Sequence, residues 1–180
     1  MFKAPGGFIT VVDHQTGYVR ALASFPTFDP AAFVEGIPNP VWKQLNDPAN
    51  AYPLNNRAVQ GLYAPGSTFK ILITAAAIEN GMENEVFEDN GSIIIDEREI
   101  RNSESKAYGK IDLKKALALS SNVVYAHLGT ELGMGSFMDI TNRTGFEKEI
   151  PFDIPMSKSR FPYESMDKTD LAEAAIGQGK

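Results

Sequence analysis

Residues 63–80 have the sequence YAPGSTFKILITAAAIEN, which predicts a helix from Thr68 to Asn80. Apolar side chains recur on nearly every side of that helix, and a helix that is apolar all round belongs in a protein core. Pro65-Gly66 is a turn-forming pair of the kind expected just before a helix. Gly81 follows the end of the helix, where glycine readily takes the left-handed cap conformation. We expect the rest of the chain to pack around this element.

Lys70 is the one charged residue in the apolar part of this helix, and burying a charge is costly. Ser67 lies three residues earlier, and positions i and i+3 share a helix face. Burial lowers the pKa of an amine, and a neutral amine can accept the proton of a nearby hydroxyl. The pair therefore predicts a nucleophile, Ser67, with Lys70 as its base. The alternative is an ordinary helix cap at Ser67 and a lysine that extends its amine to solvent.

The spacing Ser-x-x-Lys occurs twice more, at Ser103/Lys106 and at Ser165/Lys168. Both of these pairs lie in polar, loop-like surroundings, where nothing would desolvate the amine. Only the pair in the apolar helix meets the physical conditions for an activated serine.

Ser120-Ser121-Asn122 interrupts a second helical stretch between Leu119 and Val123. Serine and asparagine side chains compete for backbone hydrogen bonds and favour turns over helix interiors. A break of this kind presents a hydroxyl and an amide from one small loop, which suits proton relay and the binding of a substrate carbonyl. The alternative is a simple junction between two helices.

The remaining pattern places strands first and helices afterwards, which predicts an α/β (α+β layered) fold in a single domain over residues 1–180. A β-hairpin is expected from residues 8–12 and 18–23, and weaker strands at 92–96 and 99–102. Between residues 25 and 66 the chain is irregular, apart from a short helix from Asn39-Pro40 through Leu45. Further helices are expected at residues 113–119, 122–132, 135–144 and 170–176.

Composition excludes several classes of function. The chain has no cysteine, and its two histidines lie far apart, so a thiol nucleophile, a histidine triad and a metal centre are not expected. The net charge is −6 and no basic stripe exists, so nucleic acid is not a predicted partner. The acidic residues crowd into positions 83–104, which we read as a solvated face. No run of ~18 apolar residues predicts a membrane span, and residues 1–7 lack the apolar core of a signal peptide.

Two of these motifs together, Ser-x-x-Lys and Ser-x-Asn, are part of the signature of penicillin-binding proteins and serine β-lactamases. The chain resembles the class B penicillin-binding proteins, which are peptidoglycan D,D-transpeptidases, in the order and rough spacing of several segments. They are residues 7–30, Leu54–Gln60, Tyr63–Lys70, Ala118–Asn122 and Ala175–Gly179. The resemblance implies the serine β-lactamase-like transpeptidase fold, and it covers essentially the whole chain.

The resemblance also implies a role for each matching position. Ser67 would form the acyl-enzyme with a stem peptide, Lys70 would be the general base, and Ser120 would pass the proton to the leaving amine. Asn122 would bind the substrate amide carbonyl, and the backbone N–H of Ser67 would supply half of the oxyanion hole. No cofactor is implied. The partners implied are peptidoglycan stem peptides, β-lactam antibiotics as covalent inhibitors, and partner proteins of cell-wall synthesis. The implied location is the extracytoplasmic face of the bacterial cell membrane, held by an anchor outside this chain.

One element of the family pattern, Lys-Thr-Gly, is missing, so we expect a transpeptidase domain that is incomplete at its C-terminal end. Lys168-Thr169-Asp170 lacks the glycine, and Arg143-Thr144-Gly145 reads as the end of a helix. Two other functions stay open. One is a serine β-lactamase or β-lactam sensor, against which Asn122 argues, because class D enzymes typically have valine there. The other is a scaffold module that keeps the fold without the chemistry.

Overall fold

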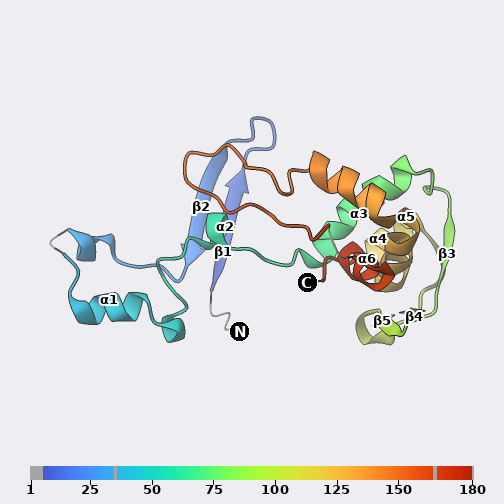
Figure 1. The fold of residues 1–180 in the computed structure, drawn as a ribbon, viewed down its shortest axis with the longest axis horizontal. Coiled ribbons are helices and arrows are strands. Elements are labelled where there is room, and N and C mark those ends of the chain that lie inside the picture. The colour runs from blue at the N-terminus through green and yellow to red at the C-terminus, as the bar shows by residue number, and fades with distance from the viewer. Residues whose placement is uncertain (1–5, 35, 164–165, 180) are drawn as a thin grey trace. The chain divides into compact units, whose positions relative to one another are not determined.

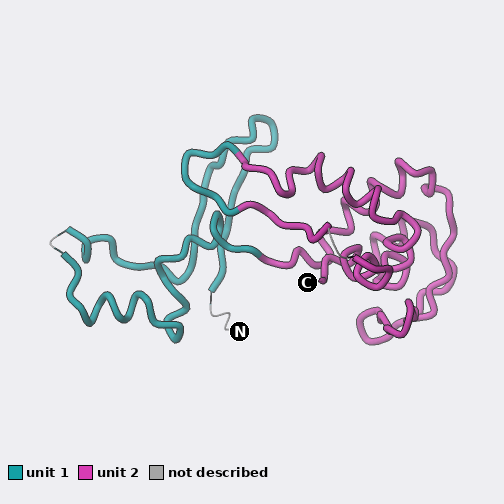
Figure 2. The backbone as a smooth tube through the Cα atoms, viewed as in Figure 1, with its two compact units in different colours: residues 1–62, 151–157 teal, residues 63–150, 158–180 magenta. Residues whose placement is uncertain are grey.

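The computed structural model describes residues 6–34, 36–163 and 166–179, and the chain forms two compact units. Unit 1 consists of residues 1–62 and 151–157, and unit 2 of residues 63–150 and 158–180 (Figure 2). That all 180 residues belong to a single partial transpeptidase domain stays a prediction. Among the residues described, no helix is both long enough and apolar enough to span a membrane.

Unit 1 is built on the predicted β-hairpin, which is confirmed (Figure 1). Strands β1 (Gly7–Val12) and β2 (Val19–Phe25) pair antiparallel, with an irregularity in register between Val11 and Val12. The carboxylate of Asp13 accepts the backbone N–H groups of Gln15 and Thr16 and so shapes the turn between the strands.

The irregular stretch of unit 1 contains short helices. Helix α1 (Asn39–Leu45) is the predicted one, and it begins after Pro38 with Pro40 in its first turn. Helix α2 (Arg57–Gln60) was not predicted and is capped by the side chain of Asn56. Two 3-10 turns complete the stretch, η1 (Pro30–Phe33) and η2 (Pro48–Asn50).

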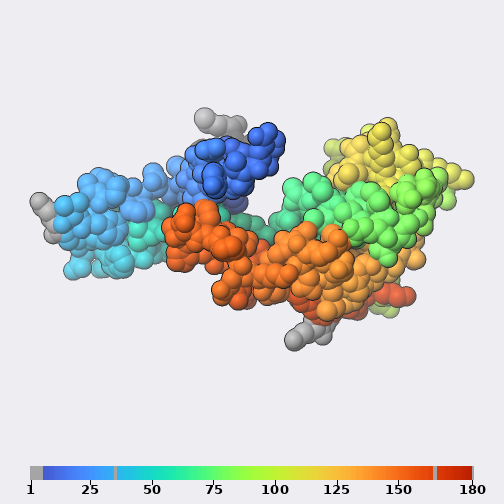
Figure 3. Space-filling view, turned by 90° about the horizontal axis from the view of Figure 1, so that it is seen from above, coloured from blue at the N-terminus to red at the C-terminus, as the bar shows by residue number. Residues whose placement is uncertain are grey.

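Unit 2 is mainly helical and carries the predicted core helix. A 3-10 turn, η3 (Gly66–Phe69), leads directly into α3 (Lys70–Glu79), which packs against the long helix α5 (Asn122–Arg143). The space-filling view shows α3 (green) against the C-terminal part of α5 (orange; Figure 3). Helices α4 (Leu113–Leu119) and α6 (Lys168–Ala175) complete the cluster (Figure 1).

Two antiparallel strand pairs belong to unit 2. The pair of β4 (Ser92–Ile95) with β5 (Arg98–Arg101) was predicted, and the pair of β3 (Val86–Asp89) with β6 (Gly109–Asp112) was not. A short 3-10 turn, η4 (Ser103–Ser105), follows β5. The combination of helices and strands agrees with the predicted α/β class.

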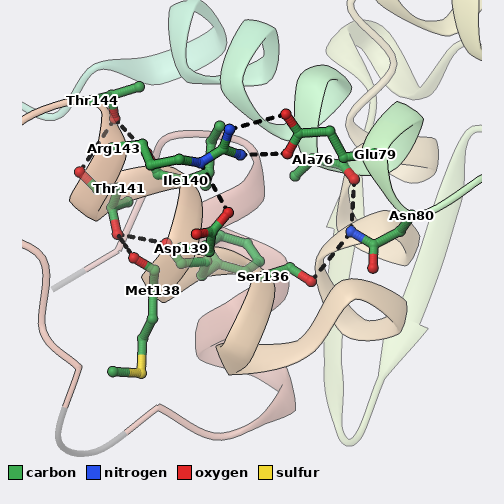
Figure 4. Close-up of polar contacts among 11 residues, drawn as sticks. Ala76, Glu79, Asn80, Ser136, Met138, Asp139, Ile140, Thr141, Arg143 and Thr144 are labelled. Atoms are coloured by element: carbon green, nitrogen blue, oxygen red, sulfur yellow. Dashed lines mark hydrogen bonds and ion pairs between the residues drawn. The ribbon is translucent and has the colours of Figure 1, made fainter.

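The core of unit 2 lies where α3, α5 and α6 meet. Phe69, Phe137 and Phe161 stack with ring centroids 5.7–6.5 Å apart, and Phe146 contacts two of these rings edge-on. At the outer end of the α3–α5 contact, the Arg143 guanidinium bonds both carboxylate oxygens of Glu79 (Figure 4). This exposed ion pair joins the C-terminal ends of α3 and α5.

Of three helix predictions, two need correction and one is confirmed. Helix α3 is not buried on all sides, because Ile71 and Ile78 are 63% and 51% exposed. The two helices predicted over residues 122–144 are confirmed as the two parts of α5, because Gly133, with φ of 65° and ψ of 175°, leaves the helical region between them. Helix α6 begins at Lys168, two residues early, because Asp167 and Asp170 form a capping box.

Candidate active site

Ser67 is exposed in the first turn of η3, at the start of the core helix. The residue before it, Gly66, is bonded to the segment that follows α6, because the N–H of Gly66 donates to the carbonyl of Gly177 at 2.9 Å. A Cβ on Gly177 would lie 1.9 Å from the Gly66 oxygen, so only glycine fits there. The segment Ile176–Gly179 therefore supports the serine through backbone contact alone.

The Lys70 amine is buried beside the serine, and its side chain is 0% exposed. It donates to the carbonyl oxygen of Ser120 at 2.8 Å, to the Ser120 hydroxyl at 3.1 Å and to Oδ1 of Asn122 at 2.7 Å. The ring centroid of Tyr125 lies 5.3 Å from Nζ, within cation–π range. Burial lowers the pKa of Lys70 from 10.5 to about 8. The prediction of a desolvated lysine is therefore supported by geometry.

The link between the amine and the nucleophile runs through Ser120. Ser120 Oγ lies 3.1 Å from Lys70 Nζ and donates to Ser67 Oγ at 3.0 Å. Among the described residues, no hydrogen bond joins Lys70 to Ser67 directly. The expectation that the amine reaches the nucleophile itself is thus corrected, because the Ser120 hydroxyl lies between them and takes the third proton of the ammonium group.

The Ser120-Ser121-Asn122 break has the form that the sequence predicts. Helix α4 ends at Leu119, Ser120 takes a left-handed conformation with φ of 54°, and Ser121 caps α5 by accepting from the N–H of Val124 at 3.0 Å. Asn122 is the first residue of α5, and its Nδ2 donates to the carbonyl of Arg101 at 2.8 Å. Since Nδ2 carries two protons, a second one is available to a substrate carbonyl.

The four predicted site residues, Ser67, Lys70, Ser120 and Asn122, are therefore joined by hydrogen bonds within unit 2. No group of three or more histidine or acidic side chains among the described residues is arranged to hold a metal ion. What the cluster offers is a serine hydroxyl, a lysine of lowered pKa and a hydroxyl relay between them. This set is suited to nucleophilic acyl transfer.

Behind the site lies a group that the sequence reading missed. Asp89 belongs to the segment interpreted as a solvated acidic face, and for this residue the interpretation is wrong, because Asp89 is 0% exposed. Its carboxylate accepts from Ser121 Oγ at 2.5 Å and from Asn102 Nδ2 at 2.8 and 2.9 Å. A sequence signal existed, since Asp89 follows Phe87 by two positions and so shares the buried face of strand β3.

The two triplets that partly match Lys-Thr-Gly lie at helix ends. Arg143 is the last residue of α5 and Thr144 is its cap, so Arg143-Thr144-Gly145 is a helix end. Lys168 and Thr169 lie in the first turn of α6. Neither triplet lies on a strand.

Comparison with known proteins agrees with the geometry. The family described as "Penicillin binding protein transpeptidase domain" matches residues 7–179. "Penicillin-binding protein 3" of Bacillus subtilis is 29% identical over 188 residues, which cover 99% of this chain and 27% of that protein.

Two solved structures share the fold over nearly the whole chain. The D,D-transpeptidase domain of a peptidoglycan glycosyltransferase from Eggerthella lenta is 36% identical, with a TM-score of 0.84 over 96% of this chain and 41% of that one. The imipenem acyl-enzyme of penicillin-binding protein A from M. tuberculosis is 28% identical, with a TM-score of 0.87 over 96% of this chain and 41% of that one.

This chain thus spans less than half the length of each of these proteins. Its match to the family nevertheless extends over almost every residue, and the overall fold agrees with it. The predicted resemblance is confirmed, and the chain belongs to the family of penicillin-binding protein transpeptidase domains.

Proposed function

We propose that this chain carries the acyl-transfer centre of a peptidoglycan D,D-transpeptidase, with Ser67 as its nucleophile. Ser67 Oγ attacks the carbonyl carbon of the penultimate D-alanine of a stem peptide. The bond to the terminal D-alanine breaks, and an ester on Ser67 remains. The amine of a second stem peptide then attacks this ester, which forms the cross-link and returns the hydroxyl to Ser67.

The observation that carries the proposal is the hydrogen-bonded series from Lys70 through Ser120 to Ser67. For acylation the direction of donation reverses, so that Ser67 donates to Ser120 and Ser120 donates to a neutral Lys70. Because the pKa of Lys70 is about 8, roughly a tenth of the amine is neutral at pH 7. The same amine, once protonated, supplies the proton for the departing amino group through Ser120.

The substrate is held by groups that are already oriented. Asn122 is fixed between Lys70 and the carbonyl of Arg101, and its second amide proton binds the carbonyl of the peptide. The backbone N–H of Ser67 lies in the first turn of η3, where it has no intrahelical acceptor, and forms half of the oxyanion hole. These roles follow the family pattern at matching positions.

The remaining proposals concern the protein as a whole. The M. tuberculosis relative forms an acyl-enzyme with imipenem, and on that ground β-lactams are proposed to acylate Ser67 here. We place the site on the extracytoplasmic face of the bacterial cell membrane, where peptidoglycan is assembled. Residues 1–180 are proposed to be one partial transpeptidase domain, and partner proteins of cell-wall synthesis remain a prediction.

The test is covalent labelling of the full-length protein with a fluorescent penicillin, followed by mapping of the modified peptide. We expect one penicilloyl group on the peptide that contains Ser67. This adduct should persist for much longer than the time in which a β-lactamase completes many turnovers. Labelling at another residue contradicts the assignment of the nucleophile. Rapid hydrolysis of many equivalents of a chromogenic cephalosporin would instead indicate a β-lactamase.

A further inference from the structure

The buried carboxylate of Asp89 takes no part in the acyl transfer proposed above, yet it lies directly behind the site. It ends strand β3 and is fully buried, and two of the side chains that donate to it, Ser121 and Asn102, are joined to residues of the site. Its donors are Ser121 Oγ, Asn102 Nδ2 and the backbone N–H of Gly91, the last at 2.9 Å. A buried carboxylate with this many donors restrains whatever those donors belong to.

Two hydrogen-bonded paths connect Asp89 with the amine of Lys70. The first runs through Ser121, which donates to Asp89 and directly follows Ser120, whose carbonyl and hydroxyl both bind the amine. Ser121 and Ser120 are thus consecutive residues, of which one bonds the buried carboxylate and the other the buried amine.

The second path runs through Asn102. Its Nδ2 donates to both Asp89 oxygens, and its Oδ1 accepts the backbone N–H of Asn122 at 2.8 Å and that of Val123 at 3.2 Å. The side chain of Asn122 in turn accepts from Lys70. Asn102 is itself buried and holds the backbone at the start of α5.

We propose that Asp89, acting through Ser121 and Asn102, is a positioning residue that holds the Ser120–Asn122 loop against the Lys70 amine for acylation of Ser67. This inference rests on the proposed function and deepens it. Backbone hydrogen bonds hold the start of the loop to the end of α4, and the carboxylate adds a side-chain restraint through Ser121 and Asn102. Displacement of a relay by a fraction of a hydrogen-bond length lowers a rate by about ten- to a hundredfold.

The test separates acylation from binding in the full-length protein. Stopped-flow measurements with a chromogenic cephalosporin yield the acylation rate constant and the noncovalent dissociation constant independently. In Asp89→Asn one carboxylate oxygen becomes an N–H donor, which removes one bond from Asn102 and the bond from either Ser121 or Gly91, while the volume of the side chain is kept. We expect the acylation rate constant to fall at least tenfold and the dissociation constant to stay within about twofold.

Glu88→Gln is the matched control, because Glu88 is the neighbouring carboxylate of β3 and is exposed on the opposite face. It should change neither constant. An acylation rate constant for folded Asp89→Asn within threefold of the parent overturns the proposal, as does a loss confined to the dissociation constant.

If Asp89→Asn does not fold, Ser121→Ala is measured in its place, since it removes one donor and leaves the carboxylate bound by Asn102. The same tenfold loss is expected, and a rate constant within threefold of the parent overturns the proposal. A parent protein that does not acylate on Ser67 contradicts the proposed function itself, which is a distinct outcome.

Discussion

The pattern Ser-x-x-Lys at Ser67/Lys70 can be compared with its copy at Ser103/Lys106 in the same unit. Ser67 and Lys70 lie on continuous helical backbone formed by η3 and α3, and the Lys70 side chain is fully buried. Ser103 begins the single turn η4, and Lys106 already has an extended conformation with ψ of 122°. Both residues of the copy are exposed.

The two lysines also differ in what surrounds the amine. The amine of Lys70 is enclosed by Ser120, Asn122 and the ring of Tyr125. The amine of Lys106 lies 5.6 Å from the ring centroid of the half-buried Tyr108, and Lys106 itself is exposed to solvent. Spacing alone therefore carries no chemistry. A helix that continues through the motif and a buried amine are what distinguish one pair from the other. The third pair cannot be compared, because Ser165 lies outside the described residues.

Replacement of each serine by alanine should give the largest difference in penicillin labelling between the two pairs. Ser67→Ala removes the only atom that can carry the acyl group and should abolish penicillin labelling, while its exposed position keeps the melting temperature close to that of the parent. Ser103→Ala should label at the parental rate. Gel fluorescence and thermal unfolding check both variants, and residual labelling of Ser67→Ala at the same peptide would contradict the comparison.

Replacement of the two lysines should give the next largest effect. Lys70→Ala deletes the proposed base and should slow acylation by about 10²–10⁴-fold. Lys106→Ala should stay within about twofold of the parent, since the exposed Lys106 is not desolvated and is not bonded to the site residues. The measurement is the second-order rate constant of labelling. A Lys70→Ala rate within threefold of the parent would remove the base assignment.

The pH dependence of labelling sharpens the same contrast. Only the neutral amine accepts a proton, and burial lowers the pKa of Lys70 to about 8. The rate should therefore rise about tenfold per pH unit below that value and level off above it. Lys106→Ala should keep this profile. A rate that is flat between pH 6 and pH 9 would show that the titrating group is not Lys70.

The smallest expected effect is on stability. The pKa of Lys70 is about 8 in the folded chain and 10.5 as the ordinary value, so between these values the unfolded state binds more protons and stability rises with pH. The penalty of burying the ammonium is fully present below pH 8 and relieved by pH 10.5. After solvent screening is allowed for, the gain is on the order of 1–2 kcal/mol.

Denaturant unfolding at a series of pH values measures this contribution of Lys70 to the free energy of unfolding. Lys70→Met lacks the titrating group and should lack the rise between pH 8 and pH 10.5, whereas Lys106→Met should retain it. If the free energy of unfolding of Lys70→Met rises with pH as steeply as that of the parent, the buried amine is not the source of the rise.

The sequence was sufficient for features that depend on local chemistry. The hairpin, the helix through Lys70 and the break at Ser120–Asn122 follow from turn residues, periodicity and capping, and all are found. What could not be read was the partner of each polar group across the chain. Asp89 precedes Asn-Gly, a turn signal, and its burial depends on Asn102 and Ser121, which are 13 and 32 residues away.

The same limit explains the site. The spacing placed Lys70 within reach of Ser67, but only the left-handed conformation of Ser120 brings its hydroxyl between the two. Likewise the exposed Ile71 and Ile78 show that an apolar sequence does not reveal which side of a helix the chain covers. Tertiary contacts of this kind carry no local signature.

The contact between Gly66 and Gly177 has a mechanical consequence. The two backbones are in direct contact there, with no side chain between them. The segment after α6 therefore limits the movement of the turn that contains Ser67. Displacement of Gly177, which precedes the exposed Gln178, therefore requires Gly66, the residue before Ser67, to move with it. A fluorophore attached at position 178 would thus register strain in the catalytic turn from outside the site.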